Sequence, residues 1–255
     1  MQSPQEVLPP NPDYGLGVFR RRIALHRSEQ RVEVELEDCS HAMRVCLTHN
    51  GEVITAVQGD VLRAPVNTCP SAPQALGEFV GKALHSDPGF FVKQVDARAQ
   101  CTHLHDMTSL AAAQALSREV KTCIDVAVAD ERNGIIDAQI LLNGDVVHHW
   151  QLRGDRIEHP AALRGRPLYK GFITWVLAQF EGRERVCALA LQRGVMVANA
   201  RRWDMRAAYG QPADDFGPGK NVCYSYSEPR IHSARRSESS VRDFTHTPEE
   251  LLRFR

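Results

Sequence analysis

Strict alternation of polar and apolar residues marks the stretch Arg31-Val32-Glu33-Val34-Glu35-Leu36-Glu37. A period of two residues is that of a β-strand with one buried face and one face in water. The alternation returns at Met43, Val45 and Leu47, and the Asn50-Gly51 pair that follows is typical of a tight hairpin turn. Residues 53–57 would form the returning strand, so this part of the chain predicts an antiparallel sheet.

Helical patterns follow the predicted sheet. Ser71 and Gln74 have the spacing of a capping box, and an apolar stripe continues at Leu76, Phe79, Val80 and Leu84. A second helix is predicted over residues 106–116, where consecutive alanines favour the helical state.

The same order of signals occurs again in the second half of the chain. Alternating strands are predicted near residues 124–128 and 136–142, Asn143-Gly144 supplies another turn, and residues 146–152 return. A Gly-Asp pair, a proline and a helix over residues 168–180 complete the series, as they do in the first half. We interpret this order as an internal duplication. The alternative is coincidence, because Asn-Gly hairpins and amphipathic helices are both common.

These patterns predict an α+β fold built from two related units, each an antiparallel sheet with a helix, over residues 18–118 and 119–209. A last helix over residues 185–203 and a tail over residues 210–255 would bridge the units. Residues 1–17, rich in Pro and Gly, are expected to form an arm. The tail is expected to pack back on the body because it carries aromatic residues. The units could pair within one chain or across a homodimer, and the sequence leaves both open.

Composition excludes several classes of protein. The 255 residues contain 31 basic and 31 acidic side chains, so no overall field attracts nucleic acid or an anionic membrane surface. No stretch approaches the roughly 20 apolar residues that span a bilayer. The N-terminus has no secretion signal, and the seven scattered cysteines are therefore expected to be reduced thiols in the cytoplasm. No glycine-rich phosphate loop or dinucleotide fingerprint is present, which disfavours nucleotide cofactors.

Candidate site residues gather at the ends of predicted elements, at Asp38 to His41, at Cys69 and at Cys101 to Asp106. His103 and Asp106 are three residues apart, so on a helix they share one face, and a carboxylate beside an imidazole suits a general base. His41 or Tyr224 would be the acid partner. A metal reading uses Cys69, Cys101 and His103, since thiolate and imidazole are both zinc donors. The third interpretation is that both cysteines are buried small apolar residues.

Three consecutive arginines lie within the first predicted strand, over residues 18–25. On a strand Arg20 and Arg22 share one face, and Arg21 projects from the other. Arg20 and Arg22 are candidates for holding a carboxylate or phenolate of a substrate. The alternative is that they form a solvated basic edge.

Several of these features together resemble a bacterial family known as domain of unknown function 2889. They are Gly17 to Ile23, Glu37-Asp38 with His41 and Met43, Pro65 with Cys69-Pro70, Cys101 to Leu104, Cys223 to Tyr226 and Arg242-Asp243-Phe244. The resemblance implies a link to the catabolism of aromatic and other small organic acids, including lignin-derived compounds. A fainter likeness, to iron–sulfur scaffold proteins, rests on three strands, Cys69 and a later Cys/His pair, and it is an analogy of fold only.

The function expected from the residues and the resemblance together is that of an enzyme without a nucleotide cofactor. It would be a lyase or isomerase acting on a small aromatic compound, with a C–C elimination that releases a small aldehyde as one such reaction. The alternative function is a metal or iron–sulfur carrier with zinc or a cluster bound by Cys69, Cys101 and His103. A third hypothesis is a binding or assembly module.

Overall fold

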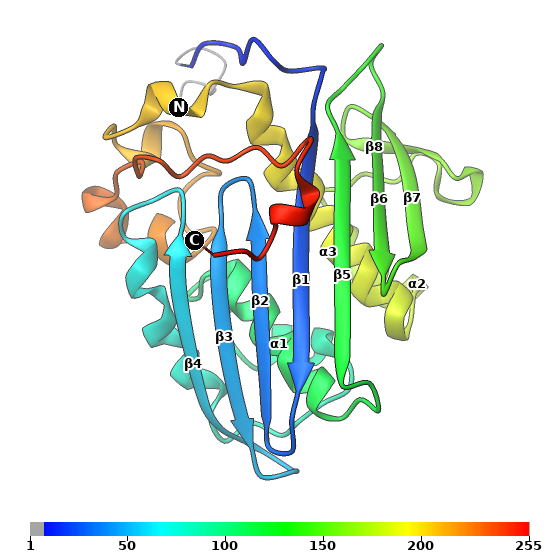
Figure 1. Ribbon diagram of the computed structural model, residues 1–255, viewed down its shortest axis with the longest axis vertical. Coiled ribbons are helices and arrows are strands. Elements are labelled where there is room, and N and C mark those ends of the chain that lie inside the picture. The colour runs from blue at the N-terminus through cyan, green and yellow to red at the C-terminus, as the bar shows by residue number, and fades with distance from the viewer. Residues whose placement is uncertain (1–7, 255) are drawn as a thin grey trace.

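A single antiparallel sheet of eight strands forms the body of the molecule (Figure 1). The computed structural model describes residues 8–254. The strands run in the order β4-β3-β2-β1-β5-β6-β7-β8, so that β1 pairs with β5 and joins the first half of the chain to the second. Their bounds are β1 Val18–Arg27, β2 Arg31–Asp38, β3 Ala42–His49, β4 Ile54–Arg63, β5 Lys121–Ala129, β6 Ile136–Leu142, β7 Asp145–Arg153 and β8 Arg156–His159. With its helices, this sheet confirms the α+β class.

Three α-helices lie behind the sheet in the view of Figure 1, and they cover its apolar face. They are α1 Thr102–Ala115, α2 Phe172–Gln179 and α3 Gly182–Ala198. Helix α1 packs on β2 and β3, and α3 packs on β5 and β6. Val32, Val34 and Leu36 of the alternating stretch are buried under α1, whereas Arg31 and Glu33 are exposed on the opposite face. The sheet therefore has one covered face and one wetted face, as the alternation predicts.

The helix predicted near residues 71–84 differs from the expectation. Residues Cys69–Phe79 form the 3-10 helix η2 rather than an α-helix. Pro73 lies inside this segment, and proline has no N–H to donate to an α-helical hydrogen bond, which favours a tighter and irregular turn. A second short 3-10 helix, η3, covers Pro88–Lys93. Among the described residues, no helix is both long and apolar enough to cross a membrane.

The two Asn-Gly hairpins occupy different places in the sheet. The hairpin at Asn50-Gly51 joins β3 to the edge strand β4, but the one at Asn143-Gly144 joins β6 to β7, and β8 still lies outside β7. The two hairpins are thus not in equivalent positions about the central β1–β5 pair. The structure does not show the duplication, which stays a prediction.

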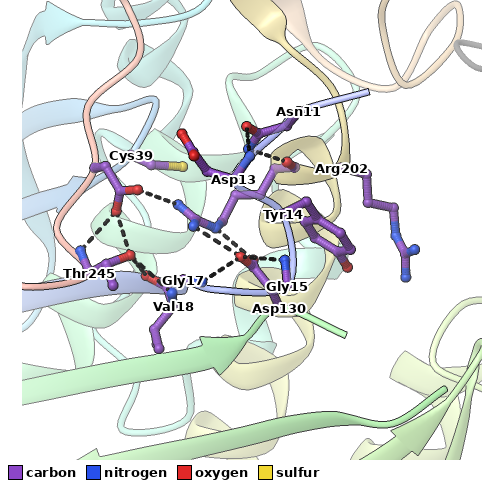
Figure 2. A network of polar contacts seen from close by, with 12 residues as sticks. Asn11, Asp13, Tyr14, Gly15, Gly17, Val18, Cys39, Asp130, Arg202 and Thr245 are labelled. Carbon is purple, nitrogen blue, oxygen red and sulfur yellow. Dashed lines mark hydrogen bonds and ion pairs between the residues drawn. The ribbon is translucent and has the colours of Figure 1, made fainter. Parts of the chain in front are cut away.

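The arm and the tail both contact the strand ends. Asp130, directly after β5, accepts hydrogen bonds from the backbone N–H groups of Gly15 and Gly17 (Figure 2). Asp130 also pairs with Arg201, and a side chain at position 17 would overlap that guanidinium, which explains the glycine. From the tail, the backbone N–H of Arg242 donates to the Cys39 carbonyl, next to the end of β2. The contact of the tail therefore holds the turn between β2 and β3, directly after Asp38.

Candidate functional site

A buried ion pair connects the neighbouring strands β1 and β2. Arg21 on β1 faces the helices, and its side chain is 3% exposed. Its Nε and Nη2 atoms donate to Oδ2 of Asp38 over 2.9 and 2.5 Å, and Asp38, the last residue of β2, is completely buried. The two residues are directly opposite each other in the β1–β2 register. The sheet itself therefore brings a cation and a carboxylate together.

The second carboxylate oxygen of Asp38 organises the turn between β2 and β3. Its Oδ1 atom accepts the backbone N–H groups of Ser40 and His41 and lies 3.0 Å from Nδ1 of His41. Burial acts to raise the pKa of Asp38, but the opposite charges of His41 and Arg21 outweigh it and hold that pKa well below its usual range. Asp38 is therefore an ionised carboxylate that fixes the orientation of the His41 ring.

His103, in the first turn of α1, completes the cluster. Its Nε2 atom lies 3.0 Å from Nη2 of Arg21, and its ring lies beside that of His41, tilted by 32° with 4.0 Å between the centroids. A guanidinium can only donate, so Nε2 of His103 accepts, and the single proton of the neutral ring is on Nδ1. Burial, with help from His41 and Arg21, lowers the pKa of His103 well below its usual value. Geometry and electrostatics thus agree on a neutral imidazole.

A cavity of about 90 Å³ lies between the sheet and the helices α1 and α3, with His103 and Arg21 in its wall. Ile23, Leu36 and Met107 form its buried end. The more exposed lining residues are Val92 of η3, Asp106 of α1 and Arg193 of α3, which therefore form its mouth. The lining is mainly apolar, with charged groups at the two ends. The cavity thus connects the buried cluster to the surface.

The structure brings together only part of the predicted site. His41 and His103 meet, but Asp106 is paired with Arg193, over 3.2 Å, and no contact with His103 is found for it in residues 8–254. Tyr224 lies under the guanidinium of Arg230 and is not part of the cluster or the cavity wall. The expectation that Asp106 orients His103 is therefore wrong, because the carboxylate beside the histidines is Asp38.

The predicted anion-binding arginines lie on the opposite face of the sheet. Arg22 pairs with Asp125, and Arg20 donates to the carbonyl of Thr245 in the tail. The sequence analysis missed Arg21 as a site residue. Its alternation did place Arg21 on the face that Ile23 shares, and a charged residue on a buried face needs a partner. That signal could have found it.

The cysteines of the metal reading do not form a ligand set with His103. Within the described part of the chain, the only group of three donors with ligand atoms within 4.8 Å of one another is Asp38, His41 and His103. Burial raises the pKa of Cys69 to about 11 and that of Cys101 to about 12, so both are protonated thiols. At the Asp38 group, the Arg21 guanidinium already occupies the position of a cation. The group is therefore better suited to proton chemistry than to a metal ion.

The depressed pKa values predict how stability depends on pH. In the folded state His103 stays neutral below its ordinary pKa of 6.5, whereas in the unfolded state it takes up a proton there. The contribution of His103 to the free energy of unfolding is therefore fully present above about pH 7. It is lost as the pH drops below 6.5, by at most about 1.4 kcal/mol per pH unit for this one group. Asp38 adds a further loss below its ordinary pKa of 3.8.

Urea unfolding of the wild type and of His103→Gln between about pH 8 and pH 5 measures this effect. The free energy of unfolding should depend less steeply on pH in the variant than in the wild type. Burial also lowers the pKa of His49, so His49 contributes to the pH dependence that remains. Equal slopes in the two proteins would show that His103 is not held neutral.

The comparisons with known proteins identify one family. Residues 21–117 match the model of the family described as "Protein of unknown function (DUF2889)". No curated protein and no solved structure matches the chain. The matched segment contains Arg21, Asp38, His41 and His103. This segment of the chain therefore matches the DUF2889 family, whose function is unknown.

Proposed function

We propose that this chain is a cofactor-independent lyase or isomerase that acts by acid–base chemistry on a small aromatic compound. A C–C elimination that releases a small aldehyde from a phenolic, lignin-type side chain is the reaction that we favour. The observation that carries the proposal is the Asp38–His41 pair beside a neutral His103, which is part of the wall of an apolar cavity. A group that accepts a proton, next to a second group that donates a hydrogen bond, is a usual basis of acid–base catalysis at neutral pH.

The geometry distributes the roles differently from the sequence hypothesis, in which His103 is the base. Because Arg21 occupies Nε2 of His103, the proton of the neutral ring is on Nδ1, and in this proposal that N–H donates a hydrogen bond to a substrate in the cavity. The carboxylate of Asp38 contacts Nδ1 of His41, so in the neutral form of this ring the proton is on Nδ1 and the Nε2 lone pair can accept a proton. His41 is outside the cavity wall, with its ring centroid 4.0 Å from that of His103, and in this proposal it receives the proton of a substrate hydroxyl through one water.

In the favoured reaction the hydroxyl proton of the substrate passes to Nε2 of His41. The C–C bond then breaks and its carbon–oxygen fragment leaves as the aldehyde. The bonding electron pair forms a C=C bond as a hydroxyl group on the neighbouring side-chain carbon departs, and that hydroxyl leaves as water with the proton that His41 received. The Nδ1–H of His103 donates a hydrogen bond to the oxygen of the departing aldehyde while the C–C bond breaks. Asp38 and Arg21 act as positioning residues, because Asp38 holds His41 and Arg21 holds His103.

The size of the cavity limits how the substrate is bound. A cavity of about 150 Å³ is known to hold one benzene molecule, and the space here is about 90 Å³. The hydroxymethyl side chain therefore fits inside, and the aromatic ring lies at the mouth between η3 and the two helices. This orientation directs the side chain toward His103 and the oxygen of the ring toward the surface.

The test is an assay of a panel of phenolic compounds that carry a hydroxymethyl side chain, with aldehyde release and alkene or isomer formation as readouts. Aldehyde formed in equal amount to the phenol consumed supports the lyase, and a rearranged product without aldehyde supports the isomerase. Absence of both reactions across the panel, with protein that is folded by circular dichroism, would overturn the proposal.

A further inference from the structure

The mouth of the cavity carries one arginine whose hydrogen-bonding capacity is largely unused. Arg193 of α3 lines the cavity, and its side chain is 30% exposed. Its Nε donates to Oδ2 of Asp106 over 3.2 Å. In residues 8–254 no hydrogen bond is found for its two terminal nitrogens. A planar group with four unused N–H donors thus faces the opening.

The other mouth arginine provides a contrast on the same helix. Arg185 donates to the carbonyls of Phe180 and Leu177 and pairs with Asp87. Its nitrogens therefore hold the end of α2 and the residue before η3. Arg21, at the buried end, is likewise committed to Asp38 and His103. Of the three arginines in the cavity lining, Arg193 is therefore the one with N–H groups left to donate to a ligand.

We propose that Arg193 binds an anionic group, a carboxylate or phenolate, on the ligand, and that Asp106 competes with the ligand for this arginine. The inference rests on the proposed function for the cavity as a binding site, and it narrows the substrate class to anionic aromatic compounds. A guanidinium fork matches such oxygens in geometry and charge. Arg193 thereby takes the part that the sequence analysis gave to Arg20 and Arg22.

The competing role of Asp106 follows from its position. Its carboxylate is 42% exposed, and its partners are Arg193 and the Nδ1 atom of His105 at 3.7 Å. Burial acts to raise the pKa of Asp106, but Arg193 and then His105 outweigh it, and the group is an anion. An incoming carboxylate must share or displace this internal partner. Removing the charge of Asp106 should therefore strengthen ligand binding, although Asp106 lies in the binding site.

Two substitutions of opposite expected sign test the proposal, with benzoate as the anionic probe and benzamide as its neutral counterpart. Isothermal titration should show that Arg193→Gln weakens benzoate binding by about tenfold, the size of one charge-assisted contact, and leaves benzamide unchanged. Asp106→Asn should tighten benzoate binding by up to about fivefold, the range of an exposed ion pair. The control is Arg183→Gln, which removes the same charge from the same helix but is not in the lining of this cavity, and it should leave both affinities unchanged.

The outcomes separate this inference from the proposed function. Benzamide affinity reports that each variant is folded and that the cavity is intact. Failure of the wild type to bind benzoate, or equal effects of Arg193→Gln and Arg183→Gln, would overturn the inference. If aldehyde release is found while Arg193→Gln leaves benzoate affinity unchanged, the function stands and the anion site is wrong. If the two variants shift benzoate affinity as expected but no phenol is turned over, the site stands and the lyase is wrong.

Discussion

Replacing Asp38 by Asn is expected to lower the free energy of unfolding by about 3–5 kcal/mol, the cost of removing one partner from a buried ion pair. Asp38 is completely buried and accepts hydrogen bonds from the backbone of Ser40 and His41 as well as from Arg21. An amide carries no charge, so the Arg21 guanidinium would remain buried beside a neutral group. The NH2 group of the introduced asparagine would also face other hydrogen-bond donors. Urea unfolding at pH 7 measures the change.

The matched control for this variant is Asp125→Asn. Asp125 is on β5 and pairs with Arg22, which lies next to Arg21 on β1 but on the wetted face of the sheet. The side chains of Asp125 and Arg22 are both about one-third exposed, so the loss should be below about 1 kcal/mol. Comparable losses in the two variants would mean that Asp38 is no more important to the fold than a surface carboxylate.

Replacing His41 by Gln is expected to lower kcat/KM for the phenolic substrate by about 10²- to 10⁴-fold, the usual contribution of a positioned general base. The glutamine side chain can still donate to Asp38, so the loop between β2 and β3 should keep its shape. The effect should appear mainly in kcat, because His41 is outside the wall of the cavity. Steady-state measurement of aldehyde release gives both constants.

The control for the His41 variant is Tyr224→Phe, which removes the other acid group that the sequence suggested. Tyr224 packs against Arg230 at a distance of 3.9 Å from ring to guanidinium, away from the histidines. This variant should keep the activity of the wild type. A large loss in Tyr224→Phe together with an active His41→Gln would reverse the assignment.

The sheet could be predicted from the sequence because its signals are local. Alternation at residues 31–37 and at residues 124–128 placed the correct side chains in the core, and Asn50-Gly51 marked a true hairpin. The segment after β4 was predicted less well. Its apolar spacing is helical, but Pro73 removes a backbone donor, and the chain forms a 3-10 helix there instead.

The candidate site could be predicted only in part, because its residues meet through long-range packing. His41 and His103 are 62 positions apart, and only the packing of α1 on β2 and β3 brings their rings together. Spacing along a helix suggested Asp106 as the partner of His103, since residues three apart share a face. It could not show that α3 places Arg193 beside Asp106, or that strand pairing places Arg21 opposite Asp38. Contacts between elements that are distant in sequence decided both points.

The most direct test of the account is the protonation state of the His103 ring, measured by the nitrogen-15 NMR shifts of its two ring nitrogens between about pH 5 and pH 8. The His103 ring is expected to be neutral at about pH 6, with its proton on Nδ1 and with Nε2 accepting the hydrogen bond from Arg21. A positively charged ring at that pH, or a neutral ring with its proton on Nε2, would contradict the arrangement of Arg21, Asp38, His41 and His103 described here.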